Sequence, residues 1–300
     1  HVTTVVDYGM ARKLLTFFKA YFEFWGWMLF HKEIRIVHVH GASDASFWRK
    51  RMFINIAKMF GKKVVFHCHG AEFKRFTSQH RYAVVNTLKK CDKIIALSES
   101  WKEWFEQITG QHNVVVIKNV IPPPNINKIS NEKFTLLFLG RIGKRKGIYD
   151  IIDVLKEYKS AFNGNLEFLY GGDGDIEQVD NIIKKEKLDN MAKYQGWVDS
   201  ENKQFLLNIA DAYILPSYNE GLPISVLEAM SYSLPIISTR VGGIPEIVKD
   251  GINGFLINPG DKKAIYDSIV SLMNNKELRE NMGKQSKDIV KEHLPIYVES

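Results

Sequence analysis

Cysteine is scarce in this chain of 300 residues, which contains only Cys68 and Cys91. Two cysteines cannot form a disulfide framework, and their scarcity is typical of a reducing compartment. No uninterrupted apolar run reaches about 18 residues, so no segment is predicted to span a membrane. No basic and then apolar leader opens the sequence, so no signal peptide is predicted. These features argue against a secreted mini-protein and a polytopic membrane protein.

Charge is unevenly distributed along the chain. Residues 1–130 hold 20 Lys and Arg against 9 Asp and Glu, whereas residues 131–300 hold 21 against 25. The net charges of the two halves are therefore +11 and −4, which sum to +7. A basic first half suggests a surface that faces phosphate or anionic lipid. A soluble domain rich in lysine explains the same count.

Short β-branched runs alternate with amphipathic stretches in two series. The first series has predicted strands at 34–39, 63–66, 93–97 and 114–118, with helices near 45–60, 78–90 and 100–109. The second has predicted strands at 134–139, 166–170, 192–195, 212–215 and 236–239, with helices near 148–159, 176–187, 201–208 and 223–231. This alternation predicts parallel sheets covered by helices.

Three consecutive prolines, Pro122 to Pro124, separate the two series because they cannot lie inside a helix or a central strand. The predicted fold class is α/β, with two doubly wound, Rossmann-like domains that face each other across a ligand cleft. The predicted first domain comprises residues 1–118, the linker residues 119–133 and the second domain residues 134–285. Residues 286–300 are predicted to form a C-terminal helix that packs back on the first domain.

The most informative segment follows a predicted strand. Glu220 lies in the loop after that strand, Gly221 lets a ligand approach the backbone, and Pro223 suits the first turn of the next helix. The start of that helix offers free N–H groups to an anion. Glu228 lies five residues after Pro223, which is about 7.5 Å along the helix axis. The carboxylates of Glu220 and Glu228 would therefore flank a bound phosphate. This arrangement suits the binding of a sugar nucleotide. If the pair stood alone, the simpler interpretation would be a surface helix with two solvent-exposed glutamates.

Arg141 and Lys146 follow another predicted strand. They can reach a diphosphate, the first as a planar fork and the second as a point charge. The segment lacks the Gly-Lys-Ser/Thr of a phosphate-binding P-loop, which argues against an ATPase.

Gly172 and Gly174 follow a third strand, without the third glycine of a dinucleotide fingerprint. The neighbouring Asp173 and Asp175 imitate a metal-binding pair, but a role in the turn and at a helix N-cap explains both.

Together these motifs resemble those of the retaining family-4 glycosyltransferases. The resemblance covers roughly residues 34–285. The matching residues are Asn119, Arg141, Lys146, Pro216, Ser217, the segment 220–228, Pro235 and the segment 241–246. It implies the glycosyltransferase B (GT-B) fold, with the acceptor on the first domain and the nucleotide-sugar donor on the second.

The resemblance also implies individual roles. Arg141 and Lys146 would hold the donor diphosphate, Glu220 would face the sugar hydroxyls, and Glu228 the ribose hydroxyls. Backbone groups near Gly172 and Val198 would receive the base. The predicted catalytic residues are thus His69, Arg141, Lys146 and Glu220, and the predicted donor-binding residues are Gly172, Val198, Gly221, Leu222, Pro223 and Glu228.

A leaving nucleoside diphosphate gains negative charge, which cations and a helix N-terminus stabilise without a metal. We therefore expect a metal-independent enzyme without a cofactor. The expected reaction transfers a sugar, with retention, from a UDP- or GDP-sugar to a glycan or lipid-linked acceptor in cell-surface polysaccharide or glycolipid synthesis. The sugar, the acceptor and the linkage are not determined by the sequence.

The first domain contributes a histidine-rich pattern. The segment that starts at His69 resembles the family's cleft segment, which implies that His69 contacts the donor sugar. His38 and His40 end the neighbouring strand on one face. With His67 and Cys68, these residues form a candidate zinc site. Their spacings match no metal signature, so no metal is predicted, and the default is that His38 and His67 are buried and hydrogen-bonded.

The segment 14–30 is rich in aromatic residues. One helical face is predicted to pack on the core and comprises Leu14, Phe17, Phe18, Tyr21, Trp25 and Met28. Phe22 and Trp27 extend the apolar surface, which suggests an interfacial helix near anionic lipid and a lipid-linked acceptor. Lys19 and Glu23 argue against a membrane span. The predicted location is the cytoplasm, with peripheral attachment to the inner face of the cell membrane.

Family members begin with a strand and a glycine-rich loop, whereas residues 1–7 look like a later strand, so that first segment is expected to be missing. Three alternatives remain open. One is a nucleotide-sugar epimerase of the same fold, and another is a fragment that binds the donor without catalysis. The third is a basic nucleic-acid-binding module, although the basic residues are scattered without an interleaved aromatic motif, so no nucleic acid is expected.

Overall fold

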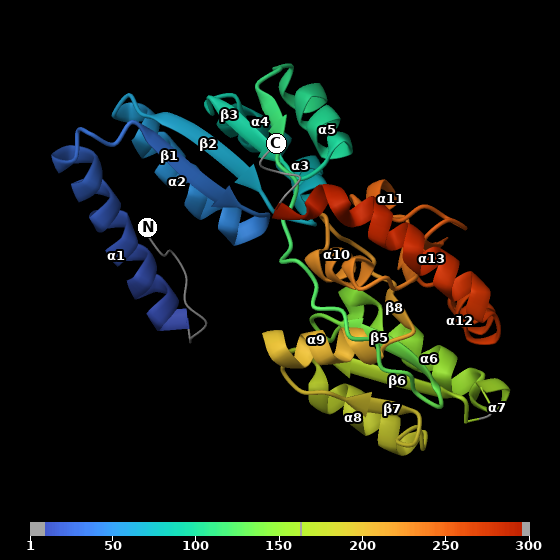
Figure 1. Cartoon of the computed structure of the whole chain (residues 1–300). Helices are drawn as coiled ribbons and strands as arrows, with labels where there is room; N and C mark the ends of the chain where they lie inside the picture. The colour runs from blue at the N-terminus through green and yellow to red at the C-terminus, as the bar shows by residue number, and fades with distance from the viewer. Residues whose placement is uncertain (1–9, 163, 296–300) are drawn as a thin grey trace. The chain divides into compact units, whose positions relative to one another are not determined.

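The computed structural model describes residues 10–162 and 164–295 (Figure 1). The chain divides into two compact units, residues 1–118 and residues 119–300. Each unit is built on one parallel β-sheet whose strands alternate with helices. The predicted α/β class is therefore confirmed. The strand predicted for residues 1–7 lies outside the described residues.

The first unit has a four-stranded sheet in the order β1-β2-β3-β4. Its strands are β1 (Ile36–Gly41), β2 (Lys63–Cys68), β3 (Lys93–Ala96) and β4 (Val114–Val116). Its helices are α1 (Met10–Phe30), α2 (Asp44–Met59), α3 (Phe73–Gln79), α4 (Arg81–Leu88) and α5 (Glu99–Thr109). The core is rich in aromatic residues, and its fully buried side chains include Phe47, Phe66, Phe73 and Phe105.

The second unit has a six-stranded sheet in the order β10-β9-β8-β5-β6-β7. Its strands are β5 (Phe134–Leu139), β6 (Leu166–Gly171), β7 (Ala192–Tyr194), β8 (Ala212–Leu215), β9 (Ile236–Thr239) and β10 (Gly254–Ile257). Every residue of β5 is buried, as expected for a central parallel strand covered on both faces. The strand order reverses between β5 and β8, and such a switch point is where parallel sheets place their ligands.

Helices connect the strands of the second unit. They are η1 (Lys144–Lys146), α6 (Ile148–Glu157), α7 (Lys159–Phe162), α8 (Ile176–Lys185), α9 (Ser200–Ile209), α10 (Ile224–Ser231), α11 (Ile244–Ile247), α12 (Lys262–Asn274), α13 (Lys276–Ile289) and η2 (Val290–His293). Side-chain caps start three of them, since Asp199, Asp261 and Asn275 each accept a bond from a backbone N–H three residues later.

All nine strands predicted between residues 34 and 239 are present, and β5, β8 and β9 have the predicted bounds. The prediction missed β10, a strand of four residues that pairs with β9. The single helix predicted over 78–90 is wrong. The chain forms α3 and α4 there, and His80 breaks the helix with a φ of −127°.

The segment predicted as a linker is fixed to the second unit, although it has no regular secondary structure. The backbone N–H of Asn127 donates to Oδ1 of Asn208 over 2.7 Å, and Lys128 Nζ donates to the carbonyls of Leu207 and Ala210. At the other end, α13 and η2 occupy residues 286–293 of the helix predicted for 286–300, and residues 296–300 lie outside the described residues. The N–H of Ile121 donates to the carbonyl of His293, so η2 packs on the second unit.

The buried face of α1 agrees with the predicted one at Met28, which is buried, and at Phe17, Tyr21 and Trp25, which pack against the core, but differs at two positions. Phe24 is 7% exposed and belongs to the core, whereas Phe18, which we expected there, is 53% exposed. The side chain of Leu14 lies outside the described part of the chain. Other large apolar side chains of α1 also face solvent, namely Leu15, Phe22, Trp27, Leu29 and Phe30. Within the described residues, no helix has the length and apolar character needed to cross a membrane.

Candidate functional site

The loops after β5 and β8 lie at the switch point of the second sheet and are joined by an ion pair. Lys146 Nζ lies 2.5 Å from Oε1 of Glu220. The same oxygen accepts a hydrogen bond from the Ser217 hydroxyl over 2.7 Å, and Arg145 lies 3.8 Å away. Glu220 is almost completely buried, so these partners compensate the cost of removing its charge from water.

Backbone contacts hold these two loops together. The N–H of Tyr218 donates to the carbonyl of Arg145, and the Arg145 guanidinium donates to the carbonyl of Asn219 over 2.9 Å. Gly147 has a φ of +75°, and a Cβ there would lie 2.2 Å from the carbonyl oxygen of Pro216. The approach of the two loops therefore requires glycine at position 147.

Glu228, in α10, forms a second ion pair. Its Oε1 lies 2.5 Å from Nζ of Lys203 in α9. Tyr213 of β8 is fully buried, and its hydroxyl donates to the carbonyl of Leu139 over 2.8 Å. Burial raises the pKa of this hydroxyl, and the nearby charges of Glu228 and Glu220 add to the rise. Both carboxylates thus raise the pKa of the same buried hydroxyl, although less than burial does.

The segment before α10 is held from two sides. The amide nitrogen of Asn119 donates to the carbonyl of Leu222 over 3.0 Å, and the N–H of Gly243 donates to the carbonyl of Gly221 over 2.6 Å. Pro223 stands at the N-cap position, and α10 begins one residue later than predicted. The free N–H groups of this helix start are therefore held at a defined place beside Glu220.

The loops after β6 and β7 also meet. The N–H of Gly172 donates to the carbonyl of Gly196, and a Cβ at Gly171 would lie 2.4 Å from Cγ2 of Val198. The structure therefore brings together Gly172 and Val198, which were predicted from different strand ends. The hydroxyl of Tyr194 donates to the carbonyl of Gly172 over 2.7 Å and so adds a further link between β7 and the loop after β6.

Arg141, in the loop after β5, and the aspartates Asp173 and Asp175, in the loop after β6, have exposed side chains. Arg141 is 4.0 Å from Asp173, and both side chains are more than half exposed. The predicted N-cap role of Asp175 is wrong in detail. Asp175 precedes α8, but its side chain caps no backbone N–H and instead accepts a bond from the Tyr149 hydroxyl over 3.1 Å.

Four histidines form a block at the carboxyl ends of β1 and β2 in the first unit. His40 lies opposite His67 in the strand register; His38 lies two residues before His40 on β1, and His69 directly follows the end of β2, where its N–H donates to the carbonyl of Gly41. Nδ1 of His40 is 2.9 Å from Nε2 of His69. Burial lowers the pKa of His67 to about 4, with help from the neighbouring histidines.

The default expectation for His38 and His67 is wrong. His38 is exposed, and in the described part of the chain neither buried ring nitrogen of His67 has a hydrogen-bond partner. The contact predicted between His69 and a donor sugar stays a prediction.

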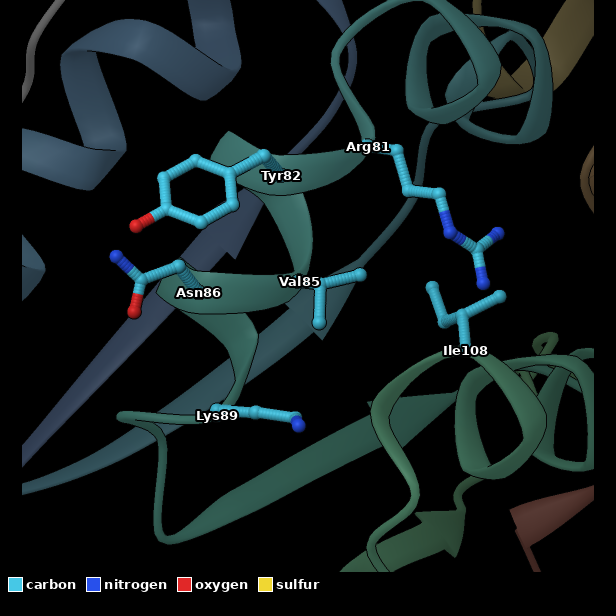
Figure 2. Close-up of a pocket in the computed structure, with 6 residues that line it drawn as sticks. All are labelled: Arg81, Tyr82, Val85, Asn86, Lys89 and Ile108. Carbon is cyan, nitrogen blue, oxygen red and sulfur yellow. The ribbon is translucent and has the colours of Figure 1, made fainter.

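A pocket of about 620 Å³ lies elsewhere on the first unit, between α4 and α5. Figure 2 shows Val85 of α4 beside Ile108 of α5, with Arg81 reaching over them and Tyr82 and Asn86 pointing away. The lining is mainly apolar and contains no carboxylate or histidine. It therefore lacks the groups expected of an acid–base site.

Sequence reasoning missed the roles of three residues in the site on the second sheet. Tyr213 reads as an ordinary strand residue, and Lys203 as an exposed helix residue. Ser217 was noted only as part of a family motif, without its bond to Glu220. The partners of Tyr213 and Lys203 lie on other elements, so only the register of the sheet and the position of α9 reveal these two roles, whereas Ser217 and Glu220 are three residues apart in one loop.

Comparison with known proteins gives consistent matches. The model of the family described as glycosyl transferases group 1 matches residues 123–289, and the model of Glycosyltransferase Family 4 matches residues 1–123. An uncharacterized glycosyltransferase of Methanocaldococcus jannaschii is 29% identical over 212 residues, which are 70% of this chain and 57% of that protein.

The 2-deoxystreptamine N-acetyl-D-glucosaminyltransferase of Niallia circulans is 30% identical over 231 residues, which are 75% of this chain and 58% of that enzyme. The chain thus spans a little over half the length of these two relatives. Among solved structures, HepE of Anabaena in complex with UDP has a TM-score of 0.75 and 19% identity, over 90% of this chain and 77% of that one. This likeness shows the fold, which is of the predicted GT-B class.

Proposed function

We propose a glycosyltransferase activity for this chain, which belongs to the glycosyl transferases group 1 family. The proposed reaction transfers a sugar from a nucleotide-sugar donor to a glycan or lipid-linked acceptor. The observation that carries the proposal is the buried contact between Lys146 and Glu220 at the switch point of the second sheet. It places a cation and a carboxylate side by side, as a phosphate-linked sugar requires.

The chemistry of each group supports this assignment. An ammonium group has three N–H donors, so Lys146 can bond Glu220 and still donate to a diphosphate oxygen. Oε1 of Glu220 takes the bonds from Lys146 and Ser217. Oε2 is the second oxygen, suited to accept a bond from a sugar hydroxyl. As the glycosidic bond breaks, Lys146, Arg141 and the start of α10 would stabilise the charge on the leaving diphosphate.

Glu228 is the proposed ligand of the ribose hydroxyls. Lys203 binds one of its oxygens, which orients the carboxylate. The base would lie against the joined loops at Gly172 and Val198, where backbone groups are accessible because glycine has no side chain. UDP is the first nucleotide to test, because the HepE structure is described as a complex with UDP. Retention at the sugar carbon is part of the proposal.

Calorimetric titration of the chain with UDP and with GDP tests the nucleotide site. We expect one of them to bind with a stoichiometry of one, and binding to be lost in Lys146→Ala and in Glu228→Ala. Lys144→Ala is the matched control, since Lys144 lies in the same short helix and is exposed. Absence of binding by the folded chain, or unchanged binding in both variants, would contradict the proposal. Product analysis with a labelled donor separates transfer to an acceptor from epimerisation of the donor.

We also propose that the first unit attaches to an anionic membrane surface through α1. This unit contains 19 Lys and Arg against 9 Asp and Glu, and α1 exposes the large apolar side chains of Phe18, Phe22 and Phe30. Apolar surface beside positive charge suits the headgroup region of a bilayer. A lipid-linked acceptor would be available at that surface.

Co-sedimentation with liposomes tests the attachment. The chain is expected to bind vesicles that contain anionic lipid more strongly than neutral vesicles, and Phe22→Glu should weaken this binding. Phe205→Glu changes a comparably exposed aromatic residue of the second unit and serves as the control. Equal binding to both kinds of vesicle would remove the membrane from the proposal and leave the nucleotide site untouched.

A further inference from the structure

The block of His38, His40, His67 and His69 has the composition of a metal site. β1 and β2 are parallel and paired, so residues two apart on each strand point to the same face of the sheet. His38 and His40 of β1 therefore form a compact group with His67 of β2 and with His69, which directly follows β2. The ring centroids of His38 and His40 are 4.4 Å apart, those of His40 and His67 5.1 Å, and those of His67 and His69 4.0 Å.

Three of these residues bring their nitrogen atoms close enough to share one ion. One ligand atom from each of His38, His40 and His67 lies within 4.8 Å of the others. Nitrogens bound to tetrahedral zinc at 2.0–2.1 Å are separated by about 3.4 Å. The ligand atoms therefore need to approach one another only a little further to reach the spacing in a zinc site. His38 and His40 have exposed side chains, so small rotations can bring their nitrogens closer.

His67 supplies an independent indication. Both of its ring nitrogens are buried, and neither has a hydrogen-bond partner within the described residues. An unpaired buried polar atom is costly and calls for an explanation. A metal ion bound to one of these nitrogens would satisfy it. We propose that His38, His40 and His67 bind a divalent transition-metal ion of the zinc type.

His69 has a different part in this site. Nε2 of His69 lies 2.9 Å from Nδ1 of His40, so the other nitrogen of His40 is left for the metal. Metal-binding histidines commonly donate their second N–H to an acceptor, usually a carboxylate, a backbone carbonyl or a water molecule, which fixes the ring orientation; here the ring nitrogen of His69 takes that place. Imidazole nitrogen suits zinc, nickel and copper better than magnesium or calcium. The site joins β1 to β2 and leaves coordination positions that a small ligand can occupy.

The charge around the site limits its affinity. No carboxylate belongs to the group, and Lys50 acts on His40 as a neighbouring positive charge. Lys50→Ala is therefore expected to strengthen metal binding. A variant that only destabilised the fold would instead be expected to weaken metal binding.

The test is a calorimetric titration of the tag-free chain with Zn²⁺ after treatment with a chelator, repeated with Co²⁺ and followed by visible absorption. We expect one equivalent to bind and to raise the melting temperature. His67→Gln and His38→Gln should lower the affinity at least 10-fold, and His69→Ala by about 10-fold. His31→Gln and His112→Gln change histidines outside the group and should bind like the wild type.

Absence of stoichiometric binding by the folded wild-type chain would overturn the proposal, as would equal binding by the double variant His38→Gln/His67→Gln. His67 is partly buried, so His40→Gln, at an exposed position, gives a second test if that double variant fails to fold. Binding that is lost equally in His112→Gln would assign the ion to scattered surface histidines. None of these metal-binding results depends on whether the chain binds a nucleotide sugar.

Discussion

Nζ of Lys146 lies 2.5 Å from Oε1 of Glu220, although 74 residues separate these side chains in the sequence. The side chains are only 14% and 6% exposed. One belongs to the loop after β5 and the other to the loop after β8, the two central strands at the switch point. The pair therefore joins the halves of the sheet at the place where a ligand would lie.

Replacement of Lys146 by methionine is expected to destabilise the second unit by about 3 kcal/mol, because it leaves a buried carboxylate without its main partner. Lys146→Met/Glu220→Gln should recover part of this loss, since the double change removes the unpaired charge as well. Urea unfolding of each variant measures the effect, with Lys144→Met as the control. If Lys146→Met and Lys144→Met were equally stable, the pair would contribute nothing to the fold.

Glu228→Gln is expected to weaken nucleotide binding at least 10-fold, because a hydrogen bond to a charged group contributes about 1.5–3 kcal/mol. Lys203→Met removes the partner of Glu228 but no proposed ligand contact, so its affinity should stay within about 3-fold of the wild type. Calorimetry on both variants measures the contrast. Equal losses in the two variants would mean that the ion pair, and not a ribose contact, controls affinity.

Gly147→Ala is expected to lower the free energy of unfolding by about 1–3 kcal/mol more than Gly251→Ala does, because the added methyl group would be forced against a fixed carbonyl. Both glycines have a positive φ, +75° and +73°, so the backbone strain is matched. A Cβ at Gly147 would meet the carbonyl oxygen of Pro216, whereas a Cβ at Gly251 meets nothing within 4 Å. Thermal denaturation compares them, and similar melting temperatures would contradict the close approach of the two loops.

The two cysteines are expected to be unreactive in the folded chain. Burial raises the pKa of the Cys68 thiol, and likewise that of Cys91, to about 12 from an ordinary value of 9.0. The thiolate is the reactive form, so a thiol reagent at pH 8 should modify both residues only after unfolding. Rapid labelling of the native chain would show that one of them is accessible.

The same shifts predict a dependence of stability on pH. Above pH 9 the thiols ionise in the unfolded chain but remain protonated in the folded chain, so their contribution to stability falls as the pH rises from 9 towards 12. Cys91→Ala should reduce this fall when unfolding free energies are measured across that range. An unchanged slope in the variant would mean that other groups cause it.

Much of the fold follows from local patterns. Runs such as Phe134–Leu139 and Ile236–Thr239 are short, apolar and bounded by turn residues, so their strands were predicted with the observed bounds. The strand Gly254–Ile257 was missed although it is as long as Ile236–Thr239, because it begins with glycine, which is depleted in strands and typical of turns. The buried face of α1 was predicted imprecisely, because apolar residues surround the whole helix and periodicity alone cannot select among them.

The sequence by itself determined the alternation of strands and helices, the α/β class and the loops that carry the candidate site. These properties depend on residues close together in the chain, through side-chain periodicity and turn chemistry. Only the tertiary structure decided which side chains meet. Lys146 faces Glu220, Lys203 faces Glu228, and four histidines gather on β1 and β2. Such contacts depend on strand order and register, which arise from the packing of distant segments and leave no local trace in the sequence.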